Sequence, residues 1–302
     1  MKSISDLQEI IEQELSNINI PKSPENLYKP INYVIGLGGK RIRPILVLIA
    51  HQLFDKELKK ALAPALGIEV FHNFTLLHDD IMDNAPLRRG KKTVHEKWNN
   101  NVAILSGDTM LVHAYQLISD VDKSIVKEVL SVFNKAATQV CEGQQLDMDF
   151  ETQENVQLSD YMKMIENKTA VLLAASLQIG GITAGASKEN QNNLYHFGLN
   201  MGIAFQLKDD LLDAFGNPDE FGKQIGGDIM ANKKTHGVLS RPANMFTKTN
   251  KNEYVKPEVE LPKVPVAPSL LSSDLTIIGD LNSNGEVQID GTFTGDIKVD
   301  TL

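Results

Sequence analysis

Two aspartate clusters with the same spacing carry the residues whose types could do chemistry. They are Asp79, Asp80 and Asp83, and Asp209, Asp210 and Asp213. On a helix, the first and third carboxylates of each cluster would lie about 40° apart around the axis and roughly 6 Å apart along it, and the middle one would point sideways. Each cluster closes an apolar helical segment, where the partly negative carbonyl end disfavours acid unless a cation binds.

The matched clusters predict a magnesium site. A single cluster could equally be a solvated helix end, but two opposed clusters would offer carboxylate oxygens and leave positions for water or phosphate, as magnesium prefers. Cations lie near both clusters, at Arg88, Arg89, Lys208, Lys223 and Lys233. Because arginine and lysine suit phosphate oxygens, the pattern indicates a substrate that carries phosphate.

A third cationic stretch, GLGGKRIRP, runs from residue 36 to 44. It places flexible backbone beside Lys40, Arg41 and Arg43, but it lacks the GxxxxGK[ST] spacing and the preceding strand of a P-loop. A solvated basic helix start is the alternative interpretation of this stretch.

Composition narrows the class of protein. The 302 residues are 42% hydrophobic and carry a formal charge of -9, which argues against a dedicated nucleic-acid binder. Cys141 is the only cysteine, so neither an intrachain disulfide nor a cysteine-based zinc site is expected. The first residues form an acidic amphipathic pattern rather than a signal peptide, and no transmembrane segment is expected. We predict a cytoplasmic protein.

Helical periodicity dominates the chain to about residue 215. Long apolar runs cover residues 61–81, 102–118, 125–142 and 190–212. Breaks are expected at Pro21 and Pro24, at residues 36–39, at Pro86, at Gly180 and Gly181, and at residues 216–218. The pattern predicts an all-α domain of roughly eight to ten helices.

The C-terminal part has a different character. Prolines punctuate residues 236–269, which is typical of a linker. Residues 270–302 alternate apolar and polar side chains between glycine turns, and the Gly279 to Leu281 pattern returns sixteen residues later at Gly295 to Ile297. We expect short strands at the rung length of a β-solenoid, with two rungs at most.

With these motifs in view, residues 5 to 235 resemble the trans-isoprenyl diphosphate synthases, the family of farnesyl and geranylgeranyl diphosphate synthases. The resemblance rests on GGKRIRP, DDIMDNAPLRRG, GQQLD, Lys168 with Thr169, and KDDLLD followed by FGKQIGGDIMANKKT. It implies a helical bundle with a central apolar cavity, a homodimer, and two or three magnesium ions. The implied reaction condenses isopentenyl diphosphate with an allylic diphosphate.

The resemblance also implies residue roles. Magnesium binding falls to Asp79, Asp83, Asp209 and Asp213, and Asp80 and Asp210 support the metal-bound waters. The allylic diphosphate would contact Arg88, Lys168, Thr169, Gln206, Lys223 and Lys233. Isopentenyl diphosphate would be held by Lys40, Arg43, His72 and Arg89. Asp79, Asp80, Asp83, Arg88, Lys168, Asp209 and Asp210 make up the expected catalytic set.

Product length should depend on what closes the cavity below Asp79. Thr75 lies one turn down on the same face and is small, and Phe74 lies about 7.5 Å down. An aromatic residue at that position resembles the pattern of geranylgeranyl-producing members, so we predict a C20 product. Phe71, a further turn down, could instead cap a C15 product.

The chain departs from this family after Thr235. Family members run on into further helices, whereas the last thirty or so residues here resemble the first rungs of a bactofilin, a bacterial β-helical cytoskeletal protein. A fusion with impaired turnover is therefore one alternative. A terpene cyclase is another, disfavoured by Lys40, Arg43 and His72, because a cyclase needs no second diphosphate site. A structural protein that polymerises through its tail is a third.

Overall fold

The computed structural model describes residues 1–153 and 155–215, with side chains in the last helix to residue 212. In the C-terminal part it describes residues 269–271, 276–278, 281–282, 287–289, 292–294 and 296–298. The chain divides into two compact units, Met1–Met245 and Phe246–Leu302.

The first unit is a bundle of helices. They are α1 (Ile4–Ser16), α2 (Glu25–Ile35), α3 (Ile42–Gln52), α4 (Lys59–Met82), α5 (Val94–Lys97), α6 (Asn100–Ser119), α7 (Val126–Thr152), α8 (Leu158–Ile165), the π-helix η1 (Glu166–Ala170), α9 (Val171–Thr183) and α10 (Lys188–Phe215). The four long helices expected from the apolar runs are confirmed as α4, α6, α7 and α10. An antiparallel hairpin of β1 (Leu87–Arg88) and β2 (Lys91–Lys92), which the helical periodicity does not predict, follows α4.

Helix α9 lies at the centre of the bundle, between α3 and α10. The predicted break at Gly180 and Gly181 is wrong, because both glycines lie inside α9. A Cβ atom at Gly180 would stand 2.2 Å from the carbonyl oxygen of Val47 in α3. The glycine therefore serves close helix packing, which outweighs its weak helix propensity.

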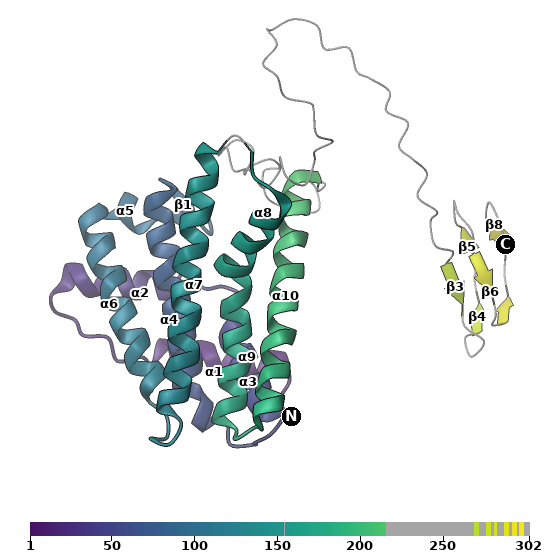
Figure 1. Cartoon of the computed structure of the whole chain (residues 1–302), viewed down its shortest axis with the longest axis horizontal. Coiled ribbons are helices and arrows are strands. Elements are labelled where there is room, and N and C mark those ends of the chain that lie inside the picture. The colour runs from purple at the N-terminus through teal and green to yellow at the C-terminus, as the bar shows by residue number, and fades with distance from the viewer. Residues whose placement is uncertain are drawn as a thin grey trace, which may run out of the picture. The chain divides into compact units, whose positions relative to one another are not determined.

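Three helices carry the candidate site residues to one end of the bundle. Helices α4, α7 and α10 all run toward the end at which the β1–β2 hairpin and α8 lie (Figure 1). Asp83 forms the C-terminal cap of α4, where its backbone N–H bonds to the carbonyl of Asp79. The carboxylate clusters of α4 and α10 thus belong to the same end of the fold, as their sequence settings predict.

The second unit pairs its short strands in parallel. The pairs are β3 (Ser269–Leu271) with β6 (Val287–Ile289), β4 (Thr276–Ile278) with β7 (Thr292–Thr294), and β5 (Leu281–Asn282) with β8 (Ile297–Lys298). Thr276 pairs with Thr292 and Leu281 with Ile297, each sixteen residues further on, whereas Ser269 pairs with Val287, eighteen residues on. In the part of the chain that is described, no helix is long and apolar enough to cross a membrane.

Candidate functional site

The middle aspartate of the first cluster is buried against an arginine. Asp80 is only 5% exposed, and Arg88 on β1 donates from Nε to both of its carboxylate oxygens, at 2.8 and 2.9 Å. Arg88 Nη2 adds a third contact of 2.7 Å to Oδ1. Burial raises the pKa of Asp80 although Arg88 opposes the shift. This ion pair joins the end of α4 to the hairpin.

The middle aspartate of the second cluster is buried among neutral donors. Asp210 is 7% exposed and accepts hydrogen bonds from the Tyr161 hydroxyl of α8 and from Gln206 Nε2, the latter at 2.8 Å. Gln206 Oε1 in turn accepts a 2.9 Å bond from the Thr169 hydroxyl. Burial raises the pKa of Asp210 despite these donors. Two residues expected at the allylic diphosphate, Thr169 and Gln206, are thus tied to the second cluster.

The two clusters show the same pattern of burial among their carboxylates. We expected the middle aspartate to point sideways, and it points into the protein in both clusters. The other described members are more accessible, because Asp79 is half-buried and Asp83 and Asp209 are exposed. The middle carboxylates are therefore buried in contacts with the protein, and Asp79, Asp83 and Asp209 are the more accessible carboxylates at the end of the bundle.

A lysine and an aspartate connect α7 to the π-helix. Lys168 Nζ in η1 lies 2.6 Å from Asp147 Oδ2 in α7. The contact requires a close approach, because a Cβ atom at Gly143 would lie 2.2 Å from the backbone nitrogen of Lys168. Lys168 is held in this way at the same end of the bundle as the carboxylates.

The donor chemistry of the cluster residues suits magnesium. Asp79, Asp83 and Asp209 carry hard carboxylate oxygens on accessible side chains, and Asp80 and Asp147 are each paired with a cation of the chain. Among the described residues, no three such side chains lie close enough together to hold a metal ion. Carboxylates repel one another, and a bound cation would be needed to draw them together. The side chain of Asp213, and Lys223 and Lys233, lie outside the described residues.

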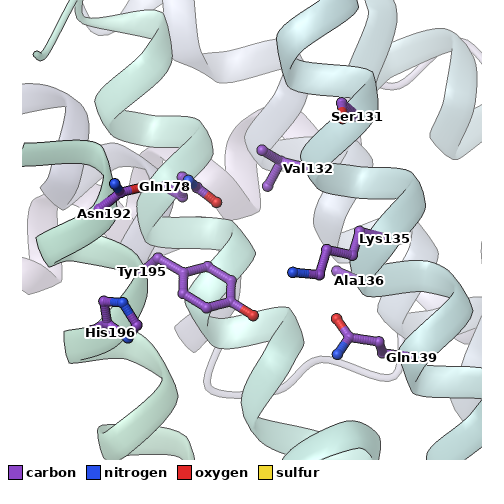
Figure 2. A pocket seen from close by; sticks show the side chains of 9 residues that line it. All are labelled: Ser131, Val132, Lys135, Ala136, Gln139, Gln178, Asn192, Tyr195 and His196. Carbon is purple, nitrogen blue, oxygen red and sulfur yellow. The ribbon is translucent and has the colours of Figure 1, made fainter. Parts of the chain in front are cut away.

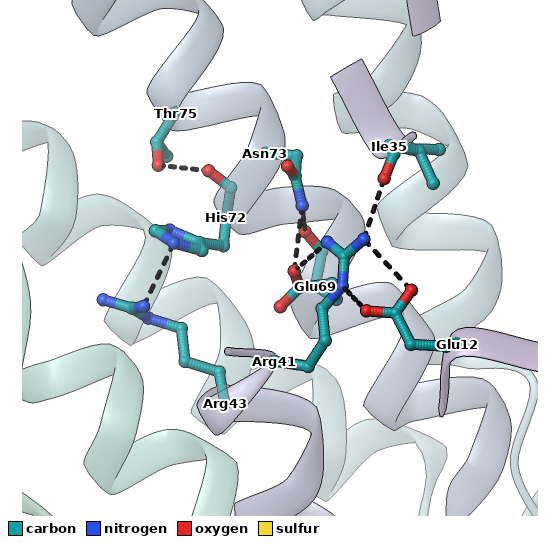
Figure 3. Close-up of polar contacts among 8 residues, drawn as sticks. All are labelled: Glu12, Ile35, Arg41, Arg43, Glu69, His72, Asn73 and Thr75. Atoms are coloured by element: carbon teal, nitrogen blue, oxygen red, sulfur yellow. Dashed lines mark hydrogen bonds and ion pairs between the residues drawn. The ribbon is translucent and has the colours of Figure 1, made fainter. Parts of the chain in front are cut away.

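A cationic pocket forms where α3 begins. Lys40, Arg43, His72 and Arg89 line one pocket of about 440 Å³, so the structure brings together all four residues expected at isopentenyl diphosphate. Arg43 Nη1 lies 3.1 Å from His72 Nε2 (Figure 3). Burial and the neighbouring Arg43 hold the pKa of His72 well below its usual range. The ring is neutral, and its Nε2 accepts from the guanidinium, which can only donate.

The glycine directly before Lys40, Gly39, lies close to Arg89. Gly39 has φ +143°, and a Cβ atom there would lie 2.9 Å from Arg89 Nη2. Arg89 itself adopts φ +53° in the β1–β2 turn. Gly39 therefore serves the shape of the cationic pocket, whereas a Cβ atom at Gly38 would meet open space.

An apolar groove lies between α4 and α7 beside Asp79. It measures about 160 Å³, and Phe74 and Thr75 line it on the α4 side. Val140, Cys141 and Met148 form the α7 wall, with the buried amide of Gln144 between them. Phe71 lies below the groove, where its ring packs on Phe74 and Phe133 with centroids 5.6 and 5.1 Å away.

A polar pocket of about 400 Å³ lies elsewhere, between α7, α9 and α10 (Figure 2). Lys135 and Gln139 of α7 face Tyr195 of α10 across it. Burial raises the pKa of Tyr195. Its residues on α7 and α10 come from the first halves of these helices, away from the aspartate clusters that end α4 and α10.

Sequence reasoning missed several residues of the site. Tyr161 lies 49 positions before the aspartate to which it donates, and no local motif connects the two. The acidic partners of Arg41, which are Glu12 and Glu69, were also missed. The ion pair between Lys168 and Asp147 was missed as well, because the two residues lie 21 positions apart.

Comparison with known proteins identifies the relatives of this chain. The polyprenyl synthetase family matches residues 24–256. The chain is 39% identical to the geranylgeranyl diphosphate synthase of Methanosarcina mazei, over 92% of this chain and 85% of that protein. It is 40% identical to the geranylfarnesyl diphosphate synthase of Natronomonas pharaonis, over 77% of this chain and 74% of that one.

A solved structure shares the fold. The crystal structure of a geranylgeranyl pyrophosphate synthase is 49% identical, with a TM-score of 0.76 over 79% of this chain and 73% of that chain. The family match and the Methanosarcina mazei alignment both extend past residue 235, where the motif resemblance ends.

Gly143→Ala should lower the melting temperature. Alanine is the better helix former, but the added Cβ atom would overlap the backbone of Lys168, and such overpacking costs about 1–3 kcal/mol. Thermal unfolding followed by circular dichroism measures the change. Glu142→Ala, at the exposed neighbouring position, is the control and should leave the melting temperature nearly unchanged. An unchanged or higher value for Gly143→Ala would contradict the close packing.

Asp210→Asn should gain stability relative to the natural chain as pH rises. The folded pKa of Asp210 exceeds its ordinary value of 3.8, so its carboxyl favours folding below that value. This contribution is lost as pH rises through the folded pKa. Asparagine can still accept from Gln206 and can donate to the Tyr161 oxygen. Melting temperatures at pH 4.5 and 7.5 without metal provide the measurement.

Asp149→Asn, at an exposed position of α7, is the control for this pH dependence. Its melting temperature should differ from that of the natural chain by the same amount at both pH values. A larger loss of stability for Asp210→Asn at pH 7.5 than at pH 4.5 would show that the carboxylate stabilises the fold.

Proposed function

This chain belongs to the polyprenyl synthetase family and is a trans-prenyltransferase, and we propose that it condenses isopentenyl diphosphate with an allylic diphosphate to geranylgeranyl diphosphate. The proposal rests on one observation. A pocket lined by Lys40, Arg43, His72 and Arg89 belongs to the same helical bundle as two aspartate clusters that end α4 and α10. Two anionic substrates and their metals can be held by these separate groups.

The allylic diphosphate would bind at the aspartate clusters. Two or three magnesium ions, held by Asp79, Asp83, Asp209 and Asp213, would supply positive charge to the diphosphate as its bond to the allylic carbon breaks. Arg88 and Lys168 would add charge-assisted hydrogen bonds, with Thr169, Gln206, Lys223 and Lys233 as further expected contacts. Asp80 and Asp147 keep the two cations in place through their ion pairs.

Isopentenyl diphosphate would bind in the cationic pocket. Arg43 and Arg89 provide forks for phosphate oxygens, and Lys40 adds a compact charge. The neutral His72 ring orients Arg43. The double bond then attacks the allylic cation, a carbon–carbon bond forms, and a proton leaves, which the departing diphosphate can accept. The apolar groove shields the cation from water.

Phe74 supports a C20 product. Its ring lines the groove beside Asp79, is 9% exposed, and rests on Phe71. The growing prenyl chain would extend along α4 until it reaches this ring. A C15 product is the alternative, and then Phe71 and Phe74 would act together as the stop.

The remaining expectations complete the proposal. Four large apolar side chains of α6 are exposed, namely Ile104, Leu105, Val112 and Tyr115, and they support a homodimer. The synthase domain would cover residues 1–235, followed by a linker over 236–269. The cytoplasmic location stays a prediction.

The parallel strand pairs support the proposal that residues 270–302 form two rungs of a bactofilin-like solenoid.

Impaired turnover is the second candidate for the activity of the whole chain. Phe197, Phe205 and Leu211 of α10 are 62%, 41% and 47% exposed, and such apolar side chains destabilise a bundle unless they are covered. A terpene cyclase has less support, because it would leave the cationic pocket without a ligand.

Asp79→Asn and Asp209→Asn should each lower the rate of product formation by about 10²–10³-fold, because each removes a charged group that stabilises the transition state. The assay combines the purified chain, magnesium, labelled isopentenyl diphosphate and each allylic primer in turn. Asp160→Asn, at an exposed position of α8, is the control. No product from the natural chain with any primer would overturn the proposed activity.

Phe74→Ala should lengthen the products, because removing the ring extends the groove toward Phe71. Chromatography of the dephosphorylated prenyl alcohols measures the chain lengths. Phe197→Ala truncates an exposed aromatic residue of α10 and should leave the product distribution unchanged. Identical products from Phe74→Ala and the natural chain would show that another residue sets the length.

A further inference from the structure

Arg41 stands between Lys40 and Arg43 but is buried. Its side chain is 1% exposed, and its backbone adopts φ +49°, a left-handed conformation, at the start of α3. This geometry turns the chain sharply between two residues that line the cationic pocket. A left-handed residue with a side chain costs energy, so the surrounding contacts must hold it.

Four N–H···O contacts hold the Arg41 guanidinium (Figure 3). Nε lies 2.9 Å from Glu12 Oε1, and Nη1 lies 2.7 Å from Glu69 Oε1. Nη2 donates to the carbonyl of Ile35 at 2.8 Å and to Glu12 Oε2 at 3.4 Å. These contacts occupy four of the five N–H donors, so Arg41 keeps no fork for a phosphate. It joins α1, the end of α2, and α4.

The position of Glu69 gives Arg41 an electrostatic role. The Glu69 side chain is 4% exposed, and Glu69 also lines the cationic pocket. A buried carboxylate beside bound diphosphate would repel it. Burial acts to lower the pKa of Arg41, but Glu12 and Glu69 outweigh that effect and raise it, so the guanidinium stays charged against Glu69. Asn73 Nδ2 adds a 3.1 Å hydrogen bond to the same Glu69 oxygen.

We propose that Arg41 is a positioning residue for the isopentenyl diphosphate subsite. It fixes the turn that directs Lys40 and Arg43 into the pocket, and it neutralises Glu69, so that this carboxylate does not offset the positive charge of Lys40, Arg43 and Arg89. It does not contact the substrate. This inference rests on the proposed function, because that function assigns the pocket its ligand.

The test compares the two substrates. Arg41→Met should raise the KM for isopentenyl diphosphate about 10–100-fold, the range expected when a buried charged group loses its partner. The KM for the allylic diphosphate should change less than threefold. Adding Glu69→Gln to Arg41→Met should recover at least a third of the lost affinity, because the repelling carboxylate is then gone. Arg41→Lys should be intermediate.

A purely structural role would give a different result. Both KM values would then change together with kcat, and Glu69→Gln would rescue nothing, which would overturn the proposal. If Arg41→Met does not fold, Glu12→Gln provides a milder test, because it weakens the contacts of the Arg41 guanidinium from a partly exposed position of α1. Glu9→Gln, at an exposed position of the same helix, is the matched control. Glu12→Gln should then raise the KM for isopentenyl diphosphate alone, and equal KM values for the two variants would overturn the proposal.

Calorimetric titration with isopentenyl diphosphate separates this inference from the proposed activity. If the natural chain binds isopentenyl diphosphate but does not turn it over, the proposed activity is contradicted. The role of Arg41 can still be tested, because Arg41→Met should then raise the Kd for isopentenyl diphosphate about 10–100-fold. Equal Kd values for the natural chain and Arg41→Met would overturn the role of Arg41.

Discussion

Carboxylates gathered at the carbonyl ends of helices are the constraint on which this fold depends. Each cluster adds negative charge where the helix dipole is already negative, and burial makes that charge more costly. In each cluster, side chains of the protein hold the buried middle aspartate. Arg88 forks onto Asp80, and two neutral donors satisfy Asp210. The hairpin, α8 and η1 are all arranged around these contacts.

Burial gives identical residue types different tasks. The middle carboxylates have raised pKa values and hold the ends of α4 and α10 to their neighbours. Asp83 and Asp209 remain exposed. The same division occurs among the arginines near α3, because Arg41 is fully engaged in ion pairs and Arg43 lines a pocket. A charged residue inside a motif is therefore not automatically a ligand of the substrate.

Sequence patterns predicted the long helices and the grouping of the cationic pocket. The apolar runs in α4 and α10 are long enough for their periodicity to identify helices. Lys40, Arg43 and Arg89 belong to motifs that carry the family resemblance, and His72, which lies outside those motifs, was grouped with them through the resemblance alone. The predicted break at Gly180 was wrong because this glycine is needed for close packing against the backbone of α3, which lies more than a hundred residues earlier in the chain. Tyr161 was missed for the same physical reason. Side chains that act through tertiary contact leave no mark in local spacing.

The π-helix η1 has a consequence for how this chain can change. A π-turn holds more residues than an α-turn, so η1 sets the rotation of α8 relative to α9. Each residue of an α-helix advances the side chains by about 100°. Losing one residue from this segment would turn Tyr161 away from Asp210 while Thr169 kept facing Gln206. The number of residues in η1 is thus constrained together with the identity of Lys168 and Thr169, because a change in length would alter which neighbours these two side chains and Tyr161 can reach.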